Sequence, residues 1–450
     1  MNLATINLSA ILPAVVLSVF GIAVMVAEPF VRDRNKSRLG WLAFAGTLAA
    51  MLALIPMAES RGQWYSSIWI VDDYSVFFTF VFLLIAAVTI LTSLDFLRRE
   101  GINYSEFHAL LLFATAGMLM MSSSNELVMV FLGLEILSIA TYVLAGFRRT
   151  DLKSNESALK YFLVGSFSSA FFLYGVALIF GATGSTKLPA IAESLRSAEI
   201  QMSLVYLSAA LMLIAMCFKV AVAPFHIWTP DVYEGAPTPV TGFMSVGPKA
   251  AGFAVLFRVF LTAFPTIEDR WTSAIWLVAA LTMVLGNVIA LVQPNIKRML
   301  AYSSIAHAGY VAVAFASASQ RGSSAALFYL LAYSLMNLGA FAIVTILSRS
   351  EDKMVNLTDY AGLGAKRPGL AAALSLFLLS LAGVPGTADY YLSVIVQMYM
   401  QEPNEEFSDV RMAGSLRVAL AVSAIGTIYL GVWPTRILDW TAAAAMNAFR

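Results

Sequence analysis

Long apolar stretches recur along almost the whole chain, with short polar segments between them. A helix needs about 20 apolar residues to cross the roughly 30 Å hydrocarbon core of a bilayer. About 13 stretches meet that requirement. They lie near residues 8–30, 39–58, 74–97, 106–122, 125–147, 157–181, 203–226, 240–263, 271–292, 299–317, 323–348, 369–400 and 412–433. The pattern predicts an all-α polytopic membrane protein, with residues 1–450 forming a single membrane-embedded unit.

Clusters of basic residues occur in alternate loops between the predicted spans. They follow the first, third, fifth, ninth and eleventh spans, so these loops share one side of the membrane. Short loops rich in Lys and Arg face the cytoplasm. The pattern predicts a multi-pass protein whose N-terminus faces the non-cytoplasmic side. The residues concerned are Arg32, Arg34, Lys36, Arg38, Arg98, Arg99, Arg148, Arg149, Lys153, Lys297, Arg298, Arg349, Lys353, Lys366 and Arg367.

Composition narrows the class of protein further. Hydrophobic residues make up 60% of the chain and charged residues 12%, and the mean hydropathy is +0.79. Because soluble domains carry about 25% charged residues, this composition excludes a soluble enzyme. A net charge of +1 gives no reason to expect nucleic-acid binding. The single cysteine, Cys217, excludes a disulfide framework and a cysteine-ligated iron–sulfur cluster, and the three scattered histidines argue against a haem or metal site.

Two ionisable residues stand inside predicted spans. Glu135 lies in the middle of 125–147, and Lys219 lies well inside 203–226. Charges at membrane depth are costly, and they commonly mark ion or proton pathways. Pro224 should interrupt the helix just after Lys219, as in transporter helices that are broken around a binding site. We expect Glu135 to control the proton on Lys219; the alternative is a structural ion pair between two helices.

Three further residues are candidates for the same pathway. Lys249 follows Gly247-Pro248, a pair that predicts an irregular helix, and is expected to be a second proton carrier. His307 lies mid-span beside hydroxyl side chains, where it would support a water chain or simply bond to a neighbouring helix. Lys160 lies just inside its span and would load protons from the cytoplasmic side or anchor the helix end.

The stretches around these candidates resemble a known family. They are residues 133–146, 158–163, 218–239 and 295–309, together with Gly-Pro-Lys at 247–249. These stretches, including Asp-Val-Tyr-Glu-Gly-Ala-Pro-Thr-Pro-Val, resemble the antiporter-like membrane subunits of respiratory complex I, the proton-pumping NADH:quinone oxidoreductase. The resemblance covers nearly the whole chain and is strongest to subunit N, which is called subunit 2 in mitochondria.

The resemblance implies a fold of about 13–14 transmembrane helices with two inverted five-helix repeats, each containing a broken helix. The repeats would lie at about 106–263 and about 271–400. Glu135, Lys219 and Lys249 match the family's proton axis. The resemblance also implies a bacterial plasma (inner) membrane, with the lipid bilayer, protons and other membrane subunits of complex I as partners. No cofactor is expected in this chain, because NADH, flavin, iron–sulfur clusters and quinone would belong to partner subunits.

The span 369–400 departs from the family pattern. At 1.5 Å per residue it would be about 48 Å long, too long for one straight crossing, and Pro385-Gly386 interrupts it. In the family, the rest of a twelfth helix with a lysine and the start of a thirteenth would follow Ala388. Here Asp389, the only ionisable substitute nearby, begins what resembles the end of the thirteenth helix. Roughly 30 residues, one and a half spans, are therefore missing, and the second repeat is shortened near residue 388.

Three explanations of this gap are open. It is an omission from the sequence, a natural deletion, or the sign of a refolded pair of half-helices that restores the topology. Without such a pair, the loss of one crossing would invert everything that follows in the chain.

The sequence therefore predicts a proton-translocating subunit of a quinone-reducing translocase, with no redox chemistry of its own. One alternative is a subunit of a multi-subunit cation/proton antiporter, against which the subunit-N-like residues 232–249 argue. The other is a structural paralogue that assembles without pumping.

Overall fold

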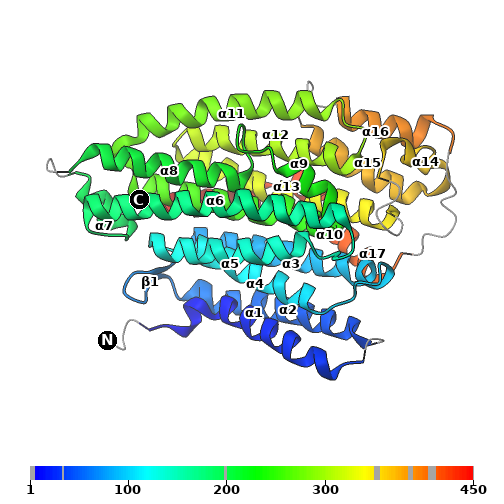
Figure 1. The fold of residues 1–450 in the computed structure, drawn as a ribbon, viewed down its shortest axis with the longest axis horizontal. Coiled ribbons are helices and arrows are strands. Elements are labelled where there is room, and N and C mark those ends of the chain that lie inside the picture. The colour runs from blue at the N-terminus through cyan, green and yellow to red at the C-terminus, as the bar shows by residue number, and fades with distance from the viewer. Residues whose placement is uncertain are drawn as a thin grey trace.

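The computed structural model describes residues 6–32, 35–196, 200–348, 355–383, 389–403 and 412–448. Most of them are helical, and Figure 1 shows the long helices running roughly side by side. The α-helices are α1 (Leu8–Ala27), α2 (Ser37–Glu59), α3 (Asp73–Arg99), α4 (Glu106–Ser122), α5 (Leu127–Ala145), α6 (Leu152–Thr183), α7 (Leu188–Ser194), α8 (Met202–Val220), α9 (Thr229–Gly235), α10 (Thr238–Ala263), α11 (Glu268–Ala290), α12 (Ile296–Ala316), α13 (Gln320–Leu347), α14 (Leu363–Lys366), α15 (Pro368–Ala382), α16 (Asp389–Met400), α17 (Gly414–Val432) and α18 (Thr435–Ala448).

Short 3-10 helices and one small hairpin complete the described elements. The 3-10 helices are η2 (Glu28–Phe30), η4 (Pro265–Ile267) and η6 (Leu357–Tyr360). The strands β1 (Gly62–Trp64) and β2 (Trp69–Val71) pair antiparallel, with Gly62 opposite Val71.

Within the described residues, 11 helices are long and apolar enough to cross a membrane. Two shorter apolar helices, α4 and α15, coincide with further predicted spans. The structure thus confirms the all-α polytopic membrane fold that the hydrophobic pattern predicts.

Three helices occupy the centre of the bundle. In the most apolar windows of α3, α10 and α13, 89%, 94% and 94% of the residues are buried, against 28% in α1 and in the α11 span. Lipid tails are as apolar as leucine, so outer helices can present apolar side chains to them while central helices contact protein all round. The polar residues of α10 are therefore shielded from the surface that would face the membrane.

An ion pair ties α10 to the start of α3. Asp72 is the N-cap of α3, and its carboxylate accepts a hydrogen bond from the Ser75 N–H over 2.8 Å. The same carboxylate accepts two bonds from the Arg258 guanidinium, at 2.5 and 2.9 Å, and the Arg258 side chain is 2% exposed. Arg258 also donates to the Ser122 carbonyl at the end of α4 over 3.1 Å. One guanidinium thus joins α3, α4 and α10.

The helix that carries Lys219 is broken as its sequence predicts. α8 ends at Val220, just before Pro224, and the chain turns at Ala221, whose φ is +59°. Residues 221–228 form no helix, and α9 then begins at Thr229. The break leaves Lys219 in the last turn of α8, so the predicted span 203–226 extends beyond the true end of the helix.

The predicted irregularity at Gly247-Pro248 is wrong. α10 runs without interruption from Thr238 to Ala263, with Pro248 inside it. Proline is tolerated inside a membrane helix when neighbouring helices hold the backbone in place. Both residues of the pair are buried, and helices pack around α10 on every side, which supplies that support.

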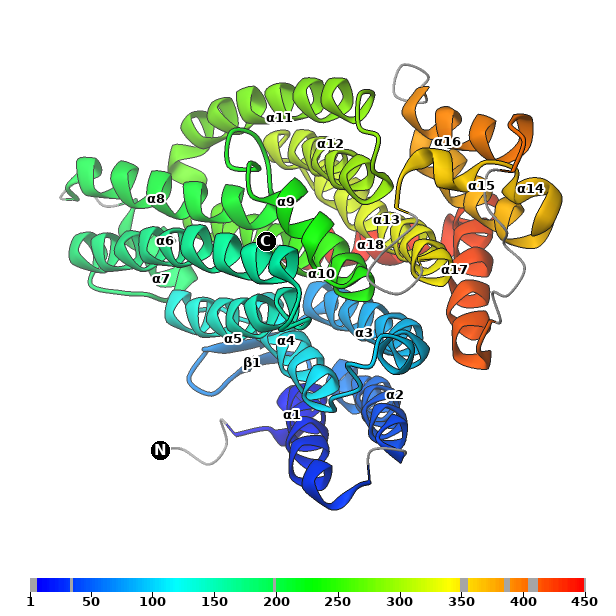
Figure 2. The same ribbon diagram turned by 45° about the vertical axis from the view of Figure 1, so that its right-hand side comes forward.

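The overlong span 369–400 is two short helices. α15 has 15 residues and α16 has 12, so they are about 22 and 18 Å long. Each is shorter than the roughly 30 Å core of a bilayer. The end of α16 lies beside α14, which directly precedes α15, because the Gly362 N–H donates to the Gln397 carbonyl over 3.1 Å. α16 therefore returns to the place where α15 begins, and Figure 2 shows α14, α15 and α16 gathered at one edge of the molecule.

This α15–α16 hairpin restores the topology. The hairpin enters and leaves at the same end of the bundle, and Met412 and Arg417 at the start of α17 line a hollow together with Pro368 and Gly369 at the start of α15. α17 therefore starts at the end where α15 starts. α15 and α16 thus form the pair of half-helices of the third explanation, and the remainder of the chain is not inverted, whether the gap is a natural deletion or an omission. The junction itself, with Pro385, Gly386 and Ala388, lies outside the described residues.

Candidate functional site

Lys219 is buried at the break between α8 and α9. Its side chain is 4% exposed, and its ammonium donates a hydrogen bond to the Ser138 hydroxyl of α5 over 2.9 Å. The ammonium also lies 5.7 Å from the centre of the Tyr161 ring of α6. A lysine normally keeps its charge solvated. Here one hydroxyl and one aromatic face take the place of water.

Glu135 lies one helical turn before Ser138, on the same face of α5. Its carboxylate accepts a hydrogen bond from the Ser169 hydroxyl of α6. Both partners are described residues, and no ion pair joins Glu135 to Lys219 in this structure. The Ser138 hydroxyl thus accepts from the Lys219 ammonium one turn along α5 from Glu135, and the carboxylate and the ammonium form no ion pair.

Lys249 is buried in the middle of α10. Its side chain is 3% exposed, and its ammonium donates to both the carbonyl and the hydroxyl of Ser304 in α12, at 2.8 and 2.5 Å. It lies 5.8 Å from the centre of the Tyr233 ring of α9. Among the described residues, no carboxylate forms an ion pair with Lys249, and its hydrogen-bond partners are the two oxygens of Ser304.

His307 lies in α12 between two tyrosines. Its Nδ1 is 2.5 Å from the Tyr329 hydroxyl of α13, and its Nε2 is 2.9 Å from the Tyr391 hydroxyl of α16. The Tyr391 hydroxyl also bonds the Ser303 hydroxyl, one turn before His307. The hydroxyls expected around His307 are therefore present, but two of them come from distant helices.

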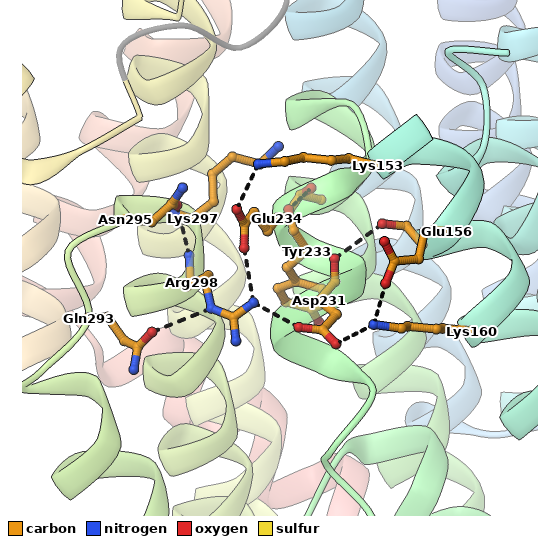
Figure 3. A network of polar contacts seen from close by, with 12 residues as sticks. Lys153, Glu156, Lys160, Asp231, Tyr233, Glu234, Gln293, Asn295, Lys297 and Arg298 are labelled. Atoms are coloured by element: carbon orange, nitrogen blue, oxygen red, sulfur yellow. Dashed lines mark hydrogen bonds and ion pairs between the residues drawn. The ribbon is translucent and has the colours of Figure 1, made fainter. Parts of the chain in front are cut away.

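Lys160 is not part of this buried set. Its side chain is 42% exposed, and its ammonium pairs with Asp231 over 2.8 Å and with Glu156 over 2.6 Å. Figure 3 shows that Asp231 bridges Lys160 to Arg298, whose guanidinium lies 2.7 Å from the second Asp231 oxygen. Lys160 thus belongs to an open ionic network at one end of the bundle.

The network connects three elements. Arg298 of α12 also donates to Glu234 of α9 over 2.9 Å, and Glu234 pairs with Lys153 of α6 over 3.3 Å. We call this set the basic-end network. Its members are Lys153, Glu156, Lys160, Asp231, Glu234 and Arg298. A cavity of about 120 Å³ opens between α6 and α9 and is lined by all of them except Arg298.

The sequence singles out only part of this chemistry. Asp231 and Glu234 lie in the short helix α9 that follows the break, and their position a few residues after the helix-breaking Pro224 is the signal that could have drawn attention to them. The partners Ser138 and Ser304 carry no such signal, because serine is common inside apolar helices. Among the described residues, no group of three His, Cys, Asp or Glu side chains could hold a metal ion.

Replacing Asp231 with asparagine tests the basic-end network. Partial burial would raise the pKa of Asp231, but the hydrogen bonds from Lys160 and Arg298 outweigh it and hold the pKa below its ordinary value. Since the carboxyl is 39% exposed, we expect Asp231→Asn to lower the free energy of unfolding by only about 1 kcal/mol. A depressed folded-state pKa gives stability that is present above the ordinary value of about 3.9 and lost as the pH falls through the folded value.

The measurement is denaturant or thermal unfolding of both proteins in detergent at pH 7 and at pH 3. The deficit of the variant should shrink at the acid pH. An equal deficit at both pH values would show that the charge of Asp231 contributes nothing.

The family described as NADH:quinone oxidoreductase/Mrp antiporter, TM, matches residues 124–403. NADH-quinone oxidoreductase subunit N of Trichlorobacter lovleyi is 43% identical over 473 aligned positions, covering 98% of this chain and 97% of the relative. The alignment is longer than the 450 residues of this chain. The relative therefore has residues without a counterpart here, as expected for a shortened chain.

Two solved structures share the fold. A chain of respiratory complex I from Thermus thermophilus with bound aureothin is 34% identical, with a TM-score of 0.80 over 96% of this chain and 99% of that one. A chain of the Mrp complex from Dietzia is 20% identical, with a TM-score of 0.84 over 99% and 98%; at that identity the likeness concerns the fold alone. The family match, the identity to subunit N and the buried lysines of a broken-helix bundle agree. The chain belongs to the antiporter-like membrane-subunit family of NADH:quinone oxidoreductase, on its subunit N branch.

Proposed function

We propose that this chain translocates protons as a membrane subunit of an NADH-quinone oxidoreductase. Glu135, Lys219 and Lys249 are the carriers, and quinone reduction in partner subunits drives the transfer. No cofactor in this chain is needed for that role. In this proposal the basic loops face the cytoplasm of a bacterium and the N-terminus faces the opposite side, which the distribution of Lys and Arg among the short loops supports.

One observation carries the proposal. Two lysines, Lys219 and Lys249, are 4% and 3% exposed inside helices of membrane-spanning length, and hydroxyl or carbonyl oxygens are their hydrogen-bond partners. A structural ion pair would place a carboxylate on the ammonium. Instead each charge is held by neutral groups, an arrangement from which a proton can leave without breaking an ion pair.

The basic-end network is the entry side of this path in our proposal. Asp231 and Glu234 lie in α9, the short helix that follows the break after Lys219. The Lys297 ammonium of α12 donates a hydrogen bond to the Ala236 carbonyl at the end of α9 over 2.8 Å. α9 is thus tied to both α6 and α12. A shift of this short helix would move the environment of both lysines together.

The test is complementation of a bacterium that lacks its own subunit N. Inverted membrane vesicles carrying this chain should oxidise NADH with quinone and acidify internally, with and without sodium. A cation/proton antiporter would instead exchange protons only when sodium is supplied, independently of NADH. An assembled, oxidising complex that pumps no more than one lacking this chain would assign the chain a structural role and overturn the proposal.

A further inference from the structure

The hollow between the starts of α15 and α17 lies at the same end of the bundle as the basic-end network. The segment before α14 pairs with the start of α12, because the Ile296 N–H donates to the Val355 carbonyl over 2.7 Å. The hollow measures about 540 Å³, within the range of about 300–1,000 Å³ that is usual for ligand pockets. Gly369 and Ala421 line it and are exposed, so it is open to the surroundings. Figure 2 shows α17 and the α15–α16 hairpin at the edge of the molecule, where lipid would surround them.

Each of the two helices carries a guanidinium at the entrance of this hollow. Arg367 is the N-cap of α15, and Arg417 lies in the first turn of α17. Arg417 is exposed and forms no ion pair within the part of the chain that the structure describes. No described acidic side chain lines the hollow, and Glu402, the described acidic residue between α16 and α17, is not part of its wall. The entrance therefore attracts an anion.

The starts of α15 and α17 add to this attraction. Neither helix has a side-chain hydrogen bond at its N-cap, and neither carries an acidic residue in its first turn. Gly369 of α15 and Gly414 of α17 have no atom within 4 Å of the place where a β-carbon would stand, so the backbone is accessible there. The first N–H groups of a helix have no partner inside it and carry partial positive charge, which favours a bound anion.

Behind the two guanidiniums the walls of the hollow are apolar. The apolar lining includes Leu370 and Ala373 of α15 and Leu420, Ala421 and Ala424 of α17. On each helix these residues follow the arginine at helical spacing, so they share its face. At 1.5 Å per residue, the apolar walls extend about 10 Å from the guanidiniums along the helices. A charged entrance followed by an apolar interior matches a phospholipid, in which a phosphate is joined to acyl chains.

We propose that this hollow, which we call the α15–α17 groove, binds one anionic phospholipid from the leaflet at the basic end of the bundle. Arg367 and Arg417 hold its phosphate through charge-assisted hydrogen bonds, and the upper part of an acyl chain lies against Leu420 and Ala421. Basic pockets between membrane helices recognise anionic headgroups in this way. The lipid joins the shortened hairpin to α17. This inference goes beyond the proposed function and does not depend on whether the chain translocates protons.

Native mass spectrometry of the full-length chain in detergent measures this binding. The probes are phosphatidylglycerol, phosphatidylethanolamine, whose ammonium offsets the charge of its phosphate, and inorganic phosphate. We expect one phosphatidylglycerol to bind more tightly than either of the others. The double variant Arg367→Gln, Arg417→Gln should bind it at least about tenfold more weakly, since a hydrogen bond to a charged group contributes about 1.5–3 kcal/mol.

A matched double variant controls for net charge. Arg321→Gln, Arg436→Gln removes two exposed arginines in the first turns of α13 and α18, neither of which lines the groove. This variant should bind phosphatidylglycerol as tightly as the parent chain. Equal losses in the two double variants would assign the binding to overall charge and overturn the groove as its site. Unchanged binding in Arg367→Gln, Arg417→Gln would overturn it too.

Ala421→Trp separates a phospholipid from a free anion. The indole fills the groove between the helices and leaves both guanidiniums in place, so we expect it to weaken the binding of phosphatidylglycerol about tenfold, as the double variant does. Unchanged binding in Ala421→Trp would show that no acyl chain enters the groove and would overturn the lipid. The same variant decides the question if the chain without the two arginines fails to fold. Equal affinity of the parent chain for phosphatidylglycerol and inorganic phosphate would leave only a free-anion site.

Discussion

Replacing Lys219 by alanine is expected to abolish the share of proton pumping that this chain contributes to its complex. The ammonium is 4% exposed and bonded to Ser138, one turn from Glu135 on α5. Alanine removes the buried amine at the break between α8 and α9, and a positioned proton-transfer group commonly contributes about 10²- to 10⁴-fold in rate. The measurement is internal acidification of inverted vesicles during NADH oxidation, with assembly checked by native gel electrophoresis.

Lys219→Arg separates a proton carrier from a structural cation. A guanidinium keeps its charge at any physiological pH, so it can replace a lysine that only holds a charge but cannot release a proton. We expect Lys219→Arg to pump as poorly as Lys219→Ala. Lys366→Ala, which removes an exposed lysine at the end of α14, should pump normally. Restored pumping in Lys219→Arg would show that charge alone is needed at this position and would refute a carrier role.

The helices themselves are predictable from the sequence, because apolar length decides whether a segment can cross a bilayer. The residues at which the helices end are less predictable. Pro224 predicts the break in α8, yet the helix already ends at Val220, where Ala221 adopts a φ of +59°. At Pro248 the same residue type leaves α10 continuous, because neighbouring helices surround it. The difference lies in tertiary packing, which the local sequence does not contain.

In the candidate site, too, some features are predictable from the sequence and others depend on tertiary packing. Lys219, Lys249 and His307 stand out in the sequence because a polar group inside an apolar run is costly unless it has a partner. Their partners do not stand out, because Ser304 and Tyr391 reach them only through the packing of α12 and α16. The role of Glu135 and the lysines as carriers, and the two inverted repeats at about 106–263 and 271–400, stay predictions.

The segment 369–400 shows most clearly how tertiary contacts add what the sequence alone does not determine. From the sequence, three explanations of the span 369–400 are open, since length alone does not say where the chain turns. The contact between Gly362 and Gln397 shows that the chain turns back in a hairpin, which restores the topology for a natural deletion and for an omission alike. The hairpin also changes the chemistry of the bundle. Because α16 begins at about half the depth of the bundle, its first turn places Tyr391 in the centre, against His307.

Breaking the Arg258–Asp72 pair is expected to cause the largest loss of stability of the variants considered. The Arg258 side chain is 2% exposed and Asp72 is 11% exposed, and two hydrogen bonds join them. Asp72→Asn leaves the guanidinium buried without its counter-charge, and removing one partner of a buried pair typically costs about 3–5 kcal/mol. Unfolding in detergent, followed by the loss of helical circular dichroism, measures the change.

The neighbouring pair supplies the control. Arg61 bonds Asp73, the residue after Asp72, but its side chain is 59% exposed. Water already screens that pair, so Arg61→Ala should cost at most about 1 kcal/mol. The double variant Asp72→Asn, Arg258→Met should be less destabilised than the sum of its single variants, because it buries no unpaired charge. Equal losses for the exposed and the buried pair would show that burial of Arg258 adds nothing, and that α3, α4 and α10 are held together by apolar packing alone.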